Sequence, residues 1–142
     1  MSKEKKYSIT KKKKNEIINI ISLCLQQYRE IFAGYIFGSF ISDKSFTDID
    51  LGILIQRQPD NLLEYEVGLE IKLGRLVKFE IDVRVLNDAP LSFVQNVLRH
   101  GQLMIDINPN RRADFENSVL KKYFDFSRFR RRYLEDVIDA PV

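Results

Sequence analysis

The sequence predicts a single α/β domain, in which helices flank a small mixed β-sheet of about four strands. Three observations lead to this prediction: the length of 142 residues, the balance of 44% apolar and 30% charged residues, and the alternation of helical and extended patterns along the chain. The length suits one hydrophobic core rather than two, and the composition is typical of a folded globular protein. No apolar run approaches the roughly 20 residues of a membrane-spanning helix.

The first half of the chain pairs one helix with two strands. Between Asn15 and Glu30, apolar residues recur at helical spacing and predict an amphipathic helix. Residues 31–38, IFAGYIFG, predict a buried strand that ends in a Gly-Ser turn. A short helix is expected over residues 40–45, FISDKS, and a second strand over residues 48–55, DIDLGILI.

The second half continues the alternation. Leucines between Leu62 and Leu76 predict a helix, and the alternating residues 78–87, KFEIDVRVLN, predict a third strand. Pro90 opens a helix that ends near His100. QLMIDI, residues 102–107, then predicts a short fourth strand. Strands that alternate with helices in this way indicate one layered α/β domain.

A last helix is expected from Pro109 into the 130s, rich in arginine and aromatic residues. Phe129 and Tyr133 are one helical turn apart, so we expect both to pack inward while the neighbouring arginines face water. Tyr123 and Phe124 are expected in the core. An alternative is that this segment forms a basic surface for RNA or for an acidic protein.

The positive charge is concentrated at the N-terminus. Residues 1–14 hold seven Lys and one Glu, whereas the remaining chain has 16 basic and 19 acidic residues. We predict a basic tail over residues 1–14 and a folded domain over residues 15–142; binding of nucleic acid by the tail stays an alternative. The N-terminus lacks the apolar core of a secretory signal, and Cys24 is the only cysteine. Both features predict a cytoplasmic protein.

Two aspartates open the second predicted strand. Asp48 and Asp50 flank Ile49, so their side chains point to the same face of that strand. Like charges so close are unfavourable unless a cation lies between them, and Mg²⁺ binds one or two carboxylates together with phosphate oxygens. Asp82 of the third strand completes the set if its strand lies beside Asp50. The alternative is that Asp48 caps a turn and that Asp50 and Asp82 face solvent.

The turn before these aspartates favours the metal site. Gly38 and Ser39 end a buried strand and precede a short helix. Backbone N–H groups and a hydroxyl can converge on phosphate oxygens at such a turn. A Gly-Ser pair alone is a weak signal, but strand, Gly-Ser, short helix, Asp-x-Asp and a third Asp form a specific combination.

Two segments, GSFISDKSFTDIDLGIL and EIDVRVLNDAP, resemble the minimal nucleotidyltransferases of the DNA polymerase β superfamily. Within that group the chain is most similar to MntA-type antitoxins, which are paired with HEPN-domain toxins of the HepT type. The resemblance covers nearly the whole chain after the tail and implies the single-domain nucleotidyltransferase fold. It departs from the family between Ser39 and Asp48, where eight residues stand in place of a longer loop.

The resemblance also implies a site and a reaction. It implies that Gly38 and Ser39 hold the triphosphate of ATP and that Asp48 and Asp50 bind two Mg²⁺ ions. Asp82 then binds the metal that activates the acceptor hydroxyl, as in two-metal catalysis. AMP is expected to pass from ATP to a tyrosine hydroxyl of the cognate HEPN toxin.

Two other functions stay open at the level of sequence. One is a non-catalytic antitoxin that acts by binding its toxin alone. The other is a small-molecule nucleotidyltransferase, although little chain remains to build the acceptor pocket that such an enzyme needs. The sequence also leaves open whether the protein forms a homo-oligomer and which nucleotide it prefers.

Overall fold

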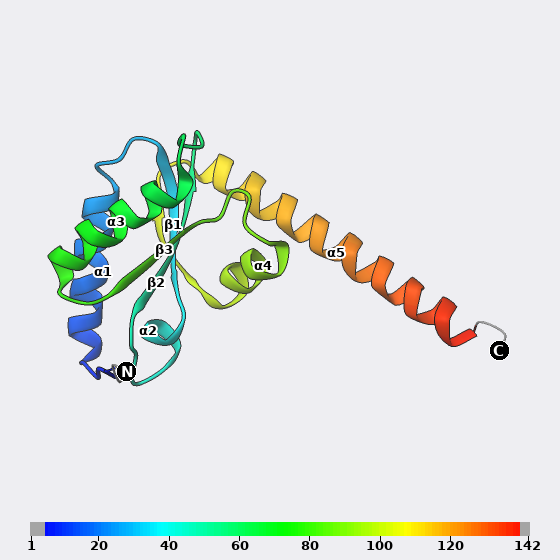
Figure 1. Ribbon diagram of the computed structural model, residues 1–142, viewed down its shortest axis with the longest axis horizontal. Coiled ribbons are helices and arrows are strands. Elements are labelled where there is room, and N and C mark those ends of the chain that lie inside the picture. The colour runs from blue at the N-terminus through cyan, green and yellow to red at the C-terminus, as the bar shows by residue number, and fades with distance from the viewer. Residues whose placement is uncertain (1–4, 140–142) are drawn as a thin grey trace.

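A four-stranded mixed sheet forms the centre of the computed structural model, which describes residues 5–139 (Figure 1). The strand order is β3-β2-β1-β4. Strand β1 pairs antiparallel with β2 and β4, and β2 pairs parallel with β3. The strands are β1 Ile31–Phe37, β2 Ile49–Ile55, β3 Ile81–Val85 and β4 Gln102–Asp106. This arrangement confirms the predicted α/β class and the alternation of its elements.

Helices cover both faces of the sheet. They are α1 Lys11–Leu25, α2 Ser39–Ser42, α3 Leu62–Val77, α4 Leu91–His100 and α5 Pro109–Asp139. One face packs against α1 and α3 and buries Ile49, Leu51 and Ile53 of β2. The opposite face packs against α4 and the first part of α5 and buries Leu54. Within residues 5–139, no helix combines the length and apolar character needed to cross a membrane.

Helix α1 begins four residues earlier and ends five residues earlier than predicted. The side chain of Thr10 accepts a hydrogen bond from the amide of Lys13 at 3.1 Å and caps the N-terminus, so residues 11–14 are helical. Leu25 is the last helical residue, because the chain then turns toward β1 through hydrogen bonds from the amides of Tyr28 and Ile31. Residues 1–4 of the predicted tail lie outside the described residues.

The N-terminal segment contacts the loop between α2 and β2. Tyr7 and Phe46 exchange backbone hydrogen bonds of 2.8 and 2.9 Å. The ammonium group of Lys14 donates to the carbonyls of Phe40 and Asp43 at 2.7 and 3.0 Å. It also lies 5.3 Å from the ring centre of Phe40. A lysine expected in a tail therefore satisfies the C-terminal carbonyls of α2 and ties that helix to α1.

Helix α5 differs most from the sequence expectation. It runs as one helix to Asp139, but only its first part lies against the sheet, and the remainder projects from the body (Figure 1). Tyr123 and Phe124 are 36% and 64% exposed, and Phe129 and Tyr133 are 68% and 60% exposed. The prediction that these four residues are buried is wrong, because the helix extends beyond the elements that could cover it.

The contact of Lys14 with α2 gives the first prediction. Lys14→Met keeps the length of the side chain but leaves two carbonyls without their donor, so the free energy of unfolding should fall by about 1–3 kcal/mol. Urea unfolding measures this change. The matched control is Lys13→Met, because Lys13 is exposed and its 3.9 Å ion pair with Glu16 is on the surface. The control should change stability by less than about 0.5 kcal/mol, and equal losses in both variants would contradict the assignment.

Candidate active site

Asp50 is the second residue of β2 and lies at one end of the sheet, between two neighbouring strands. Its register partner is Phe37 on the antiparallel strand β1 and Asp82 on the parallel strand β3. Register partners project from the same face, so Asp50 and Asp82 are side by side. Asp48 comes two residues earlier, just before β2 begins. The strand of Asp82 therefore has the position that the sequence analysis required for a three-carboxylate set.

The pKa of Asp50 reports this crowding. Burial of its carboxyl, followed by the negative charges of Asp48 and Asp82, raises the pKa of Asp50 from 3.8 to about 6. Such a group favours a nearby cation, and carboxylate oxygens are ligands that suit Mg²⁺. Within residues 5–139, no three His, Cys, Asp or Glu side chains are gathered tightly enough to form a complete metal site. The three aspartates therefore supply the donor chemistry that Mg²⁺ prefers, without forming a complete metal site by themselves.

Gly38 links the turn to the carboxylates. It precedes α2 with φ 80° and ψ −162°, a conformation that is essentially restricted to glycine. A Cβ atom at this position would clash with Oδ2 of Asp50. The absence of a side chain at Gly38 therefore allows the Gly-Ser turn and the Asp50 carboxylate to lie in direct contact.

Helix α2 begins directly at Ser39, one residue before its predicted start, and ends at Ser42, three residues before its predicted end. The amides of Ile41 and Ser42 and the hydroxyl of Ser42 all donate to the carbonyl of Gly38 at 3.1 Å. The amides that precede them in the first turn of a helix have no intrahelical acceptor. The turn at Gly38 and Ser39 thus presents N–H groups beside the carboxylates, which is an arrangement that suits a metal-bound phosphate.

A fourth carboxylate, Glu70 of α3, was missed by the sequence analysis. Its Oε2 atom accepts a hydrogen bond from the amide of Val83 at 2.8 Å, and its carboxyl lies close enough to Asp82 to interact with the charge of that residue. Burial and the neighbouring carboxylates of Asp82 and Glu66 raise the pKa of Glu70, against the effect of the Val83 amide. Glu70 therefore holds β3 next to the residue that completes the acidic set.

The sequence carried a signal for this contact. Glu66 and Glu70 are one turn apart on α3, and Glu66 accepts the amide of Val85 at 2.8 Å in the same way. Two glutamates at this spacing can accept hydrogen bonds from alternate amides of an edge strand. On an amphipathic helix the same pattern usually means a solvent-facing side, so the signal is weak without the sheet order.

Arg84 supplies positive charge on the same face as Asp82. Its Nε atom lies 4.0 Å from Oδ1 of Asp82, and its guanidinium lies 6.0 Å from the ring centre of Phe93 on α4. Both side chains of the ion pair are about half exposed or more, so the pair adds little stability. It places a basic side chain beside the carboxylates, where an anionic substrate could meet it.

A family model described as polymerase beta, nucleotidyltransferase matches residues 15–110. The chain belongs to this nucleotidyltransferase family. The match includes Gly38, Ser39 and all three aspartates, and it confirms the resemblance found in the sequence. A search of curated proteins finds no match.

Solved structures of toxin–antitoxin complexes share the fold. One is a tri-AMPylated Shewanella oneidensis HEPN toxin in complex with MNT antitoxin; the alignment has 22% identity and a TM-score of 0.67, and covers 88% of this chain and 98% of the other. A toxin–antitoxin MntA–HepT structure aligns with 21% identity and a TM-score of 0.64 over 91% and 99% of the two chains. A toxin–antitoxin structure with AMP-PNP aligns with 22% identity and a TM-score of 0.68 over 86% and 98%.

The close approach of Gly38 and Asp50 gives a second prediction. Gly38→Ala should lower the free energy of unfolding by about 1–3 kcal/mol, because alanine is strained at this φ and ψ and its Cβ meets the carboxylate. Gly68→Ala is the control, because Gly68 lies in α3 with open space around it. The control should raise stability by about 0.5–1 kcal/mol. Chemical denaturation of both variants measures the difference, and a stabilised Gly38→Ala protein would contradict the assigned contact.

The raised pKa of Asp50 gives a third prediction, for protein without divalent cations. A carboxyl with a raised pKa in the folded state favours folding below its unfolded value near 3.8 and loses that contribution by about pH 6. Wild-type stability should therefore fall relative to Asp50→Asn as the pH rises from ~4 to ~7. Urea unfolding of both proteins at the two pH values measures the change, and a constant difference between them would be evidence against the raised pKa.

Proposed function

We propose that this protein is a magnesium-dependent nucleotidyltransferase that transfers AMP from ATP to a tyrosine hydroxyl of a HEPN-domain partner and thereby acts as its antitoxin. One observation carries the proposal: Asp50 is in contact with the Gly-Ser turn on one side and lies beside Asp82 on the other. A phosphate-binding turn and metal-binding carboxylates are thus joined at one end of the sheet. Membership of the nucleotidyltransferase family supports the same chemistry.

Each site residue has a role in this proposal. Gly38 and Ser39 hold the triphosphate through the amides of the turn, and Asp48, Asp50 and Asp82 hold two Mg²⁺ ions. When bound, the ions lower the pKa of the acceptor hydroxyl and stabilise the charge of the departing pyrophosphate. The tyrosine oxygen forms a bond to the α-phosphorus of ATP, the bond to pyrophosphate breaks, and the hydroxyl proton passes to water. Glu70 keeps β3, and with it Asp82, in position through the hydrogen bond that it accepts from the amide of Val83.

The partner and the nucleotide are proposed from the structural relatives. One relative is in complex with a HEPN toxin that is AMPylated, and another contains AMP-PNP, an analogue of ATP. At 21–22% identity these likenesses establish a shared fold.

An AMP-transfer assay tests the proposal. The protein is incubated with ATP labelled in its α-phosphate, Mg²⁺ and the HEPN-domain protein encoded by the neighbouring reading frame. Label should appear on a tyrosine of the partner and should be lost in the Asp48→Ala/Asp50→Ala double variant, because the metal ligands are removed. Asp43→Asn is the control, because Asp43 is an exposed carboxylate of the preceding loop whose side chain accepts a hydrogen bond from the hydroxyl of Ser42. It should keep full activity.

The outcomes separate the proposal from its alternatives. Neutralisation of the partner that persists in the double variant, with no label transferred, would overturn the enzymatic function in favour of an antitoxin that acts by binding. Label that appears on a small molecule and not on the partner would instead support a small-molecule nucleotidyltransferase.

A further inference from the structure

The projecting part of α5, residues 120–138, is here called the outer half of α5. It carries nine large apolar side chains that are between 36% and 79% exposed. These residues are Leu120, Tyr123, Phe124, Phe126, Phe129, Tyr133, Leu134, Val137 and Ile138. So dense a set of exposed apolar residues marks an interaction surface, and an isolated helix of this length gains little stability in water without a covering partner.

The exposed apolar face continues the face that is buried in the body. Phe115 is half-buried and Val119 is buried in the cluster beneath α4. Tyr123, Phe126 and Tyr133 follow Val119 at successive intervals of four, three and seven residues, so they lie along the same side of the helix. The outer half therefore continues the packing face of α5 beyond the elements that bury its first part.

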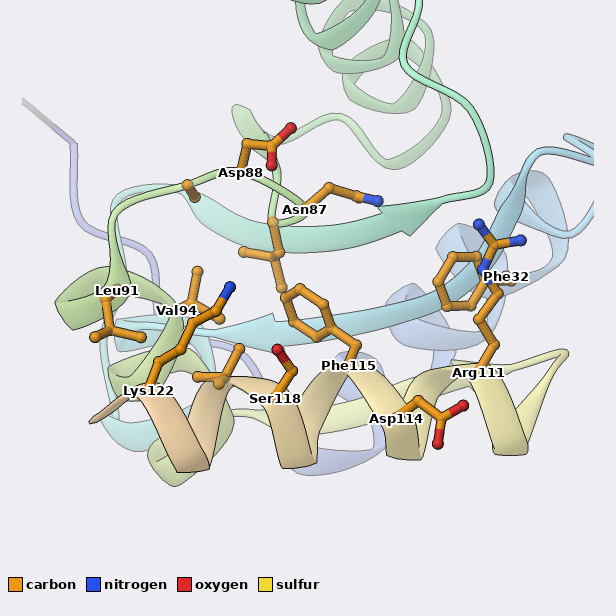
Figure 2. A pocket seen from close by; sticks show the side chains of 13 residues that line it. Phe32, Asn87, Asp88, Leu91, Val94, Arg111, Asp114, Phe115, Ser118 and Lys122 are labelled. Atoms are coloured by element: carbon orange, nitrogen blue, oxygen red, sulfur yellow. The ribbon is translucent and has the colours of Figure 1, made fainter. Parts of the chain in front are cut away.

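A groove lies at the inner end of this face (Figure 2). It has a volume of about 580 Å³ and lies between α5 and the loop that connects β3 to α4. Phe115 and Val119 form part of its apolar lining, and Lys122, which belongs to the outer half, lies at one end of the groove. A protein segment laid along α5 could thus insert apolar side chains into the groove and continue over the outer half.

Arg130 determines which kind of partner fits. Residues three and four positions away on the helix surface are its neighbours; they are Phe126, Ser127, Tyr133 and Leu134, and none is acidic. Within residues 5–139, the ion pairs of the structure do not include Arg130. A partner that covers the apolar face removes this guanidinium from water, which is unfavourable unless the partner supplies a carboxylate.

We propose that the outer half of α5 is the docking surface for the protein that receives AMP, and that Arg130 binds a carboxylate of that protein at the centre of the interface. The identity of the partner rests on the proposed function, whereas the docking surface and its acidic complement follow from α5 itself. The outer half has six basic and three acidic residues, so its net charge also favours an acidic partner surface.

Two other occupants fit this face less well. A second copy that docks through the same face would present Arg130 with a surface from which Asp125, Glu135 and Asp136 all lie more than a quarter-turn away around the helix. Nucleic acid fits less well because the aliphatic residues Leu134, Val137 and Ile138 of this face cannot stack on bases. Both occupants are outcomes of the experiment below.

Binding of the HEPN-domain protein to the full-length chain tests the proposal. Isothermal calorimetry without ATP or Mg²⁺ separates docking from catalysis. Arg130→Glu should weaken binding by about 30-fold or more, because a carboxylate of the partner then faces a second carboxylate. Arg128→Glu is a matched control: it makes the same charge reversal two residues away, at roughly 200° around the helix. This control should change the dissociation constant less than about threefold.

The outcomes test the docking proposal and the proposed catalytic function separately. Equal binding by Arg130→Glu and wild type overturns the docking proposal, even if AMP is transferred. Loss of binding in Arg130→Glu but not Arg128→Glu, with circular dichroism unchanged, supports it, even if the double aspartate variant shows that no AMP is transferred. A wild-type chain that does not bind the partner overturns both proposals.

Two further measurements exclude the other occupants. If light scattering finds a wild-type dimer that Arg130→Glu dissociates, a second copy covers the face and the proposal fails. Binding that nuclease treatment abolishes would likewise overturn it in favour of nucleic acid.

Discussion

Electrostatic repulsion among the carboxylates at one end of the sheet is the constraint on which the rest of the structure depends. Asp50 is half-buried between Asp48 and Asp82, and its pKa is raised to about 6 for that reason. Folding brings these groups together against their repulsion, so the surrounding elements must hold them firmly. Gly38 allows the closest approach from one side, and Glu70 holds β3 from the other. The strain is typical of a site that is organised for a ligand rather than for stability.

The N-terminal segment supports this arrangement through its contacts with α2 and with the loop before Asp48. Lys14 binds the end of α2, and Tyr7 pairs with Phe46 in the loop that leads to Asp48. The eight-residue segment between Ser39 and Asp48 is thus held at two points by a segment whose composition indicates a solvated tail. Packing of Tyr7 against Phe46 and Phe79, with ring centres 5.9 and 5.0 Å apart, reinforces the attachment.

Most of the fold could be predicted from the sequence, because its signals are local. The apolar period of β1 and β2, the leucine spacing of α3 and the turn residues at Gly38 and Gly101 all act within a few residues. The relation of Asp82 to Asp50 required the strand order, which the family resemblance supplied and local patterns do not. Lys14 and Glu70 could not be predicted, because each acts through a backbone group more than ten residues away. The burial of Phe129 and Tyr133 was mispredicted because amphipathic spacing does not tell whether a covering surface exists.

The two glutamates of α3 have a consequence for how this sheet can meet other chains. Strand β3 is an edge strand, yet the amides of Val83 and Val85 are occupied by Glu70 and Glu66. A strand from another molecule cannot add to this edge unless both carboxylates first release their amides. Side chains of a helix thus take the place of a fifth strand and protect the edge nearest the acidic site from the sheet extension that open edges invite.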